Sequence, residues 1–184
     1  MDFKLIILIV LILVCILYFI FTNNKLIKLD NQIKEAFSTM DVYLKKRWDL
    51  IPNIVEVVKG YAKHEEKTLT EVTEIRKSTY NKMSVDEKLN ANEDLSSKIA
   101  KIMPLVENYP DLKANENFKD LSKQLTKVED EIAQSRKYYN ATVRDFNNKI
   151  EMFPSNVVAM ILGCKKARMF EIDATDRENV KVEL

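Results

Sequence analysis

The residues that could carry out chemistry are few in this chain. Its one histidine, His64, precedes Glu65 as in zinc protease helices, but the second histidine of that motif is replaced by Thr68. A di-iron site in a helical bundle needs two histidines, so a single one excludes it. Cys15 lies in an apolar run and Cys164 follows a glycine, and neither has the neighbours of a zinc site. The sequence therefore predicts no metal and no cofactor.

The sequence also shows no pattern typical of a nucleophilic or acid–base catalytic site. Cys164 and His64 would be the one cysteine–histidine pair, and nothing near either residue supports it. Adjacent carboxylates occur among lysines at helical spacing, which is typical of solvated helix faces. These carboxylates are Glu65-Glu66, Asp86-Glu87 and Glu129-Asp130-Glu131. We predict no catalytic residues and no enzyme, the alternative being a reaction that uses His64 or Arg144 with Asp145.

The first element is an uncharged run from Leu5 to Phe21. As a helix it is ~25 Å long, against ~30 Å for the hydrocarbon core of a bilayer, so it predicts a transmembrane anchor. A cleaved signal peptide is the alternative, but no small-residue cleavage pattern follows the run. Lys25, Lys28 and Lys34 outnumber Lys4, which favours an outside N-terminus and a cytoplasmic C-terminal part.

Apolar residues then recur every three or four positions in four stretches, each typical of a helix with one buried face. The stretches run from Leu26 to Trp48, Ile51 to Ile75, Val85 to Val106 and Phe118 to Phe153. We therefore predict an all-α fold in which a single N-terminal transmembrane helix precedes an antiparallel bundle of four long helices. An intermolecular coiled coil is the alternative for the last stretch, which leaves self-association open.

Local signals set the ends of the last two helices. Ser84-Val85-Asp86-Glu87 has the form of a capping box, so a helix should begin there. This third stretch is the weakest, because Asn92 occupies an expected apolar position. Pro110 should end it, with a polar connector at 112–115, and Pro154 should end the fourth. The predicted parts are the anchor at 1–24, the bundle at 25–156, a short apolar and basic end segment at 157–170 and a mobile polar tail at 171–184.

Two segments leave alternatives open. The end segment is too short to span a bilayer, so it either closes the bundle or lies on a membrane with its basic cluster toward anionic lipid. In the stretch KRWDLIPNIV, Pro52 predicts either a helix-reversing turn capped by Asp49 or a kinked continuous helix. In the turn, Trp48 and Ile51 would cover the end of the bundle, while the basic residues before Trp48 face water or lipid phosphate.

The candidate interaction surface combines this stretch with other basic residues. It comprises Lys45, Lys46, Arg47, Trp48, Arg144, Lys165, Lys166 and Arg168. Beside the fourth stripe, a polar and aromatic band from Arg136 to Asn147 either sets helix register or lines a ligand groove. The formal charge of +1 argues against nucleic acid as a partner.

Several of these motifs together resemble the LemA family. They are LKKRWDLIPNIV from Leu44, VKGYAKHE from Val58, YPDLKAN from Tyr109, YN at Tyr139, VRDFN from Val143 and FPSN from Phe153. The resemblance implies a bacterial membrane protein with one N-terminal span and a cytoplasmic helical bundle, and it brings no reaction. Trp48 stands where the family often has Tyr, and Cys164 where it often has an aromatic residue.

The sequence thus leads to a functional hypothesis without a reaction. We expect a scaffold or interaction module at the cytoplasmic face of a bacterial cell membrane. The alternative is an accessory or regulatory subunit of a membrane enzyme such as a protease. The expected partners are the lipid bilayer, through Leu5 to Phe21, and proteins that the sequence does not identify.

Overall fold

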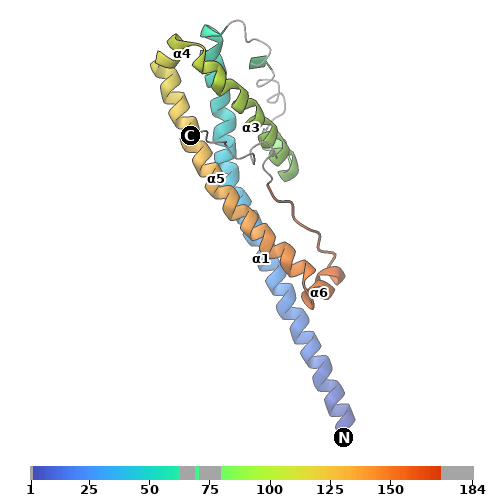
Figure 1. Cartoon of the computed structure of the whole chain (residues 1–184). Coiled ribbons are helices and arrows are strands. Elements are labelled where there is room, and N and C mark those ends of the chain that lie inside the picture. Colours follow the sequence, from blue (N-terminus) through green and yellow to red (C-terminus); the bar gives the residue numbers. More distant parts are fainter. Residues whose placement is uncertain (1, 63–68, 71–79, 171–184) are drawn as a thin grey trace, which may run out of the picture. The chain divides into compact units, whose positions relative to one another are not determined.

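The computed structural model of the chain describes residues 2–62, 69–70 and 80–170, and within them every regular element is a helix (Figure 1). The all-α class is therefore confirmed. The helices are α1 (Phe3–Tyr61), η3 (Tyr80–Lys82), α3 (Val85–Glu107), α4 (Pro110–Ala114), α5 (Glu116–Glu151) and α6 (Ser155–Ile161). His64 and the predicted tail at 171–184 lie outside the described residues.

The chain divides into two compact units, and both contain parts of α1 and α5. Unit 1 consists of Met1–Ser38 and Lys137–Met169, and unit 2 consists of Thr39–Arg136 and Phe170–Leu184. The apolar N-terminal run and α6 belong to unit 1, whereas η3, α3 and α4 belong to unit 2.

Helix α1 does not turn at Pro52. It is continuous from Phe3 to Tyr61, so of the two alternatives at Pro52 the helix continues, and the helix-reversing turn, with the separation into two helices at this point, is wrong. A proline inside a helix costs ~3 kcal/mol. Four residues around it, Ile51, Ile54, Val55 and Val58, are at most 3% exposed. Because burying each contributes ~1.5–3 kcal/mol, packing outweighs the cost of the proline.

The predicted start of α3 is confirmed in detail. The Ser84 backbone N–H donates to Glu87 Oε2 over 2.7 Å, and the Glu87 N–H donates to Ser84 Oγ over 3.3 Å. These two bonds form the expected capping box, and α3 then runs to Glu107. The Ser84 backbone N–H, followed by its hydroxyl, holds the pKa of Glu87 below its usual range.

The connector after α3 differs from the prediction. Residues expected to form a polar link belong partly to the short helix α4, which begins at Pro110. Proline suits the first position of a helix, because the N–H it lacks would have no partner there. Leu112 of α4 is fully buried, which gives this helix an anchor in unit 2.

Helix α5 follows the predicted fourth stripe. Asn115 precedes it and accepts a hydrogen bond from the Phe118 N–H over 3.0 Å, as an N-cap residue does. Six apolar positions of the stripe are buried, namely Phe118, Leu125, Ile132, Tyr139, Val143 and Phe146. The helix ends at Glu151, before Pro154 as expected, but Phe153 lies outside the core with 83% of its surface exposed.

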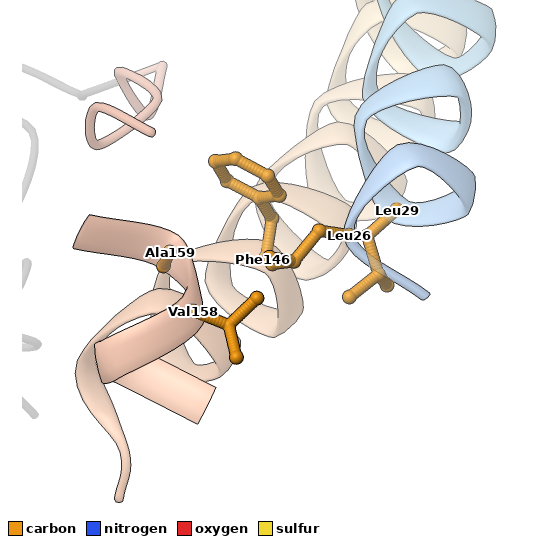
Figure 2. Close-up of a cluster of buried hydrophobic side chains, with 5 residues drawn as sticks. All are labelled: Leu26, Leu29, Phe146, Val158 and Ala159. Atoms are coloured by element: carbon orange, nitrogen blue, oxygen red, sulfur yellow. The ribbon is translucent and has the colours of Figure 1, made fainter. Parts of the chain in front are cut away.

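The core of unit 1 joins α1, α5 and α6. Leu26 and Leu29 of α1, Phe146 of α5, and Val158 and Ala159 of α6 form one buried cluster (Figure 2). N-terminal to the cluster, the side chains of the apolar run are largely exposed. By length and composition, α1 is the one described helix able to cross a membrane.

The continuity of α1 predicts a distance. Spin labels at Val42→Cys and Lys59→Cys, with Cys15 and Cys164 replaced by serine, should lie about 25 Å apart, because a helix rises ~1.5 Å per residue. Pulsed electron paramagnetic resonance measures this separation. A helix-reversing corner would instead place the labels on neighbouring helices about 10 Å apart.

The capping box predicts a pH dependence. Because the pKa of Glu87 is lowered on folding, its carboxylate stabilises the fold above the unfolded pKa of ~4.3, and this contribution disappears as pH falls through the lower, folded pKa. Urea unfolding of Glu87→Gln should therefore show a deficit against the parent that is largest at neutral pH and closes in acid. Asp130→Asn, an exposed change within α5, is the matched control for removing a surface carboxylate. A deficit of equal size at neutral and acid pH would contradict the assignment.

Candidate functional site

Arg47 belongs to unit 2 and is fully buried. Its expected place on an exposed basic edge is therefore wrong. Trp48, which was predicted to cover the end of the bundle and was included in the candidate interaction surface, is 3% exposed, so its side chain does not contribute to an accessible surface. The reason is helical phase: Arg47 is three residues after Leu44 and four before Ile51, so all three share one face of the continuous helix. Without a corner, that face points into the core.

The guanidinium of Arg47 contacts two other helices. Its Nη1 donates to Ser96 Oγ of α3 over 2.8 Å and to both carboxylate oxygens of Glu129 on α5 over 3.1 Å. Its Nη2 donates to the Asn92 backbone oxygen over 2.9 Å and to Asn92 Oδ1 over 3.0 Å. The planar fork of arginine suits such a set of directed bonds, which a lysine could not form. One side chain thereby links α1, α3 and α5.

Asn92 is the second buried polar residue of this network. It is fully buried in the apolar stripe of α3, and its Nδ2 donates to the Lys88 backbone oxygen over 2.9 Å. Its interruption of the stripe was the one sequence signal of the network. Ser96 and Glu129 carried no such signal, since Glu129 was interpreted as part of a solvated face.

A second polar group adjoins the first through Tyr80 of η3. The Tyr80 hydroxyl donates to Asp41 Oδ1 over 2.7 Å, and Lys88 Nζ binds Asp41 Oδ2 over 2.6 Å. The Tyr80 ring lies 5.2 Å from that of Trp48 between centroids. Burial, and then the hydrogen bond to Asp41, raises the pKa of Tyr80 far above its usual value. Tyr80 therefore remains a neutral donor at physiological pH.

The buried network suits a structural role better than catalysis. The charge of Arg47 is balanced by Glu129, whose side chain is 37% exposed, and its Nη1 and Nη2 groups also donate to Ser96 and Asn92. Its buried Nε has no hydrogen-bond partner among the described residues. No cluster of three or more metal-binding side chains occurs among the described residues. A buried polar set of this kind fixes the register of the helices that supply it.

An open groove lies between α1 and α5 in unit 2. It presents basic, acidic and apolar side chains together. Its lining comprises Tyr43, Lys46, Asp49, Leu50 and Asn53 of α1, and Gln124, Lys127, Val128 and Glu131 of α5. Lys46, a predicted surface residue, is exposed here, and its ammonium lies 5.4 Å from the Tyr43 ring centroid.

The other predicted surface residues are distributed between the two units. Lys45 is half-buried in unit 2 and pairs with Asp49, one helical turn away. Four residues are exposed in unit 1, namely Arg144, Lys165, Lys166 and Arg168. Lys166 pairs with Glu151. Their binding of a partner stays a prediction.

The polar band on α5 holds the end segment in unit 1. Asn147 accepts from the Ala167 N–H and donates to the Ala167 carbonyl oxygen, both over 2.9 Å. The Tyr139 hydroxyl donates to the Arg168 carbonyl oxygen over 2.8 Å. The end segment therefore occupies the Tyr139 hydroxyl and the Asn147 side chain, so neither is available to a ligand.

Comparison with known sequences bears out the resemblance. Residues 36–184 match the model of the LemA family. Over 171 residues the chain is 29% identical to Protein LemA of Metamycoplasma hominis, covering 90% of this chain and 77% of that protein. Magnetosome protein MamQ 2 of Paramagnetospirillum magneticum is 32% identical over 83 residues, and Magnetosome protein MamQ of Magnetospirillum gryphiswaldense is 30% identical over 82. Each of these two alignments covers 45% of this chain but 30% of the relative.

The network predicts unequal costs for its two charged partners. Arg47→Met should lower the free energy of unfolding by about 3–5 kcal/mol, because it leaves Asn92 Oδ1 and the Glu129 carboxylate without their Arg47 donor. Glu129→Gln should cost less, about 1–3 kcal/mol, since its half-exposed side chain still offers an acceptor. Urea unfolding in mild detergent, followed by fluorescence of the single tryptophan, measures both. Asp130→Asn is the matched control, and equal effects for it and Glu129→Gln would contradict the assignment.

Proposed function

Because the chain belongs to the LemA family, we propose that it is a membrane-anchored, non-enzymatic helical protein that presents a binding surface to other proteins. The proposed location is the cytoplasmic face of a bacterial cell membrane. The observation that carries the proposal is helix α1, which combines an exposed apolar run at Leu5 to Phe21 with a buried stripe from Leu26 onward. One helix thus serves as both anchor and core element.

An antiparallel bundle is the arrangement that the contacts support within each unit. In unit 1, Leu26 shares a cluster with Phe146, whereas Phe37, further along α1, stacks edge-on against Tyr139, at 5.9 Å between ring centroids. In unit 2, Arg47 binds Glu129, whereas the Tyr61 hydroxyl accepts from Asn115 Nδ2 over 3.0 Å. Within each unit, the residue further along α1 therefore contacts the residue that comes earlier in the segment from Asn115 to Glu151. Antiparallel neighbours show this order of contacts.

Exposure of the apolar run supports the anchor. Leu5, Leu11 and Leu13 are each 46–59% exposed, as are most side chains between them. Such a patch exceeds what a water-soluble surface tolerates, and lipid satisfies it. The lysines that follow the run support a cytoplasmic bundle, with the N-terminus outside.

The groove between α1 and α5 is the surface that we assign to a protein partner. It is open, and Lys46, Asp49 and Lys127 present both signs of charge beside the apolar Leu50 and Val128. An open groove with this mixture suits the side of a peptide or helix, whereas small molecules favour enclosed, mainly apolar cavities. A scaffold that binds proteins needs such a surface and no reactive side chain.

The groove can be tested by site-specific photocrosslinking in native membranes. A photoreactive amino acid at Lys127 or Asn53 should trap another protein, whereas the same amino acid at Gln134, exposed on α5 outside the groove lining, should not. Recovery of one membrane enzyme at both groove positions would assign an accessory subunit instead of a general scaffold. Equal trapping at Gln134, or none at the groove positions, would overturn the assignment of the surface.

A further inference from the structure

Helix α6 and the residues flanking it carry an apolar surface that the core of unit 1 does not use. Val158 and Ala159 are buried against Leu26 and Phe146 (Figure 2). Other large apolar side chains nearby are exposed: Met152 at 63%, Phe153 at 83%, Val157 at 44%, Met160 at 75%, Ile161 at 65% and Leu162 at 41%. A concentration of exposed apolar side chains within so short a segment marks a contact with something apolar.

The position of α6 along α1 indicates what that apolar partner is. Its buried residues pack in the same cluster as Leu26, and Phe19 of the apolar run packs against this cluster too. Leu26 lies only ~7 Å of helix rise beyond Phe21, whereas the polar headgroup layer of a bilayer extends ~5–8 Å beyond the hydrocarbon core. When Leu5 to Phe21 spans the core, α6 therefore lies at the level of the headgroups.

The residues that follow α6 are basic and exposed. Lys165, Lys166 and Arg168 lie within four positions of one another, and each is exposed. Lys166 also pairs with Glu151, which compensates part of this charge. Basic side chains next to an apolar surface are the combination that binds the boundary of an anionic leaflet.

We propose that residues 152–168 form a second membrane contact, in which the exposed apolar side chains enter the boundary between headgroups and acyl chains while the basic residues meet anionic headgroups. The proposal rests on the proposed anchor, because α1 positions α6 against the bilayer. Continuity with the apolar run, through Phe19, favours lipid over a second protein as the occupant. Burial of Val158 and Ala159 holds α6 in unit 1 while its other apolar residues remain available to lipid.

Depth-dependent quenching of a fluorescent label tests this contact. Full-length protein with Cys15 and Cys164 replaced by serine is labelled at Phe153→Cys or Met160→Cys in vesicles of phosphatidylcholine and phosphatidylglycerol. Lipids with a nitroxide at a shallow acyl carbon should quench either label severalfold more strongly than a label at Lys34→Cys. Lys34 is 70% exposed and lies ~20 Å beyond Phe21 along α1, so its label should instead respond to an aqueous quencher.

A fourth label, at Leu11→Cys, separates the two claims. If Leu11 is quenched by the acyl nitroxide but Phe153 and Met160 respond as Lys34 does, the second contact is wrong and the anchor stands. If Leu11 itself escapes the acyl nitroxide, the anchor fails and the second contact fails with it. Energy transfer between labelled copies at Met160 without lipid quenching would show that a second copy covers α6, which also overturns the proposal.

Discussion

The burial of the Arg47 guanidinium is the constraint on which the rest of unit 2 depends. Removing one charge from water costs several kcal/mol, and this cost is offset only when hydrogen-bonding partners surround it. The partners come from α3 and α5, so these helices must lie at one register against α1. A slip of one residue in any of them would leave buried donors and acceptors unpaired.

Helix α1, which supplies Arg47, also carries the apolar run that we propose as the membrane anchor. Helix α1 changes from exposed apolar side chains to a buried stripe at Leu26 without a break in the backbone. Unit 1 surrounds that change: α6 and the end of α5 pack on the first buried turns, and Asn147 fixes the backbone of the end segment. The proposed anchor and the proposed headgroup-level contact both belong to unit 1.

Much of this architecture was predictable, because its signals are local. The capping box at Ser84, the stripe of α5 and the stop before Pro154 each depend on residues a few positions apart. Local rules did not decide whether the helix turns or continues at Pro52. The burial of Ile51 and its neighbours outweighs the cost of a proline, and this burial depends on tertiary packing that the local sequence does not give. Arg47 was misinterpreted for a related reason: it follows two lysines in the sequence, and its partner Glu129 lies 82 positions away. Asn92, a polar residue in an apolar stripe, was the one local sign that a buried polar network existed.

The proposed cytoplasmic location of the bundle is tested most directly by whether a thiol reagent that cannot cross membranes reaches a single cysteine in it. A cysteine at Lys123, exposed on α5, is placed in full-length protein whose native cysteines are replaced, and cells are treated with a membrane-impermeant thiol reagent. The account predicts no labelling of intact cells, full labelling after permeabilisation, and retention of the protein in membranes washed with alkaline carbonate. Labelling of intact cells, or release of the protein by carbonate, would contradict it.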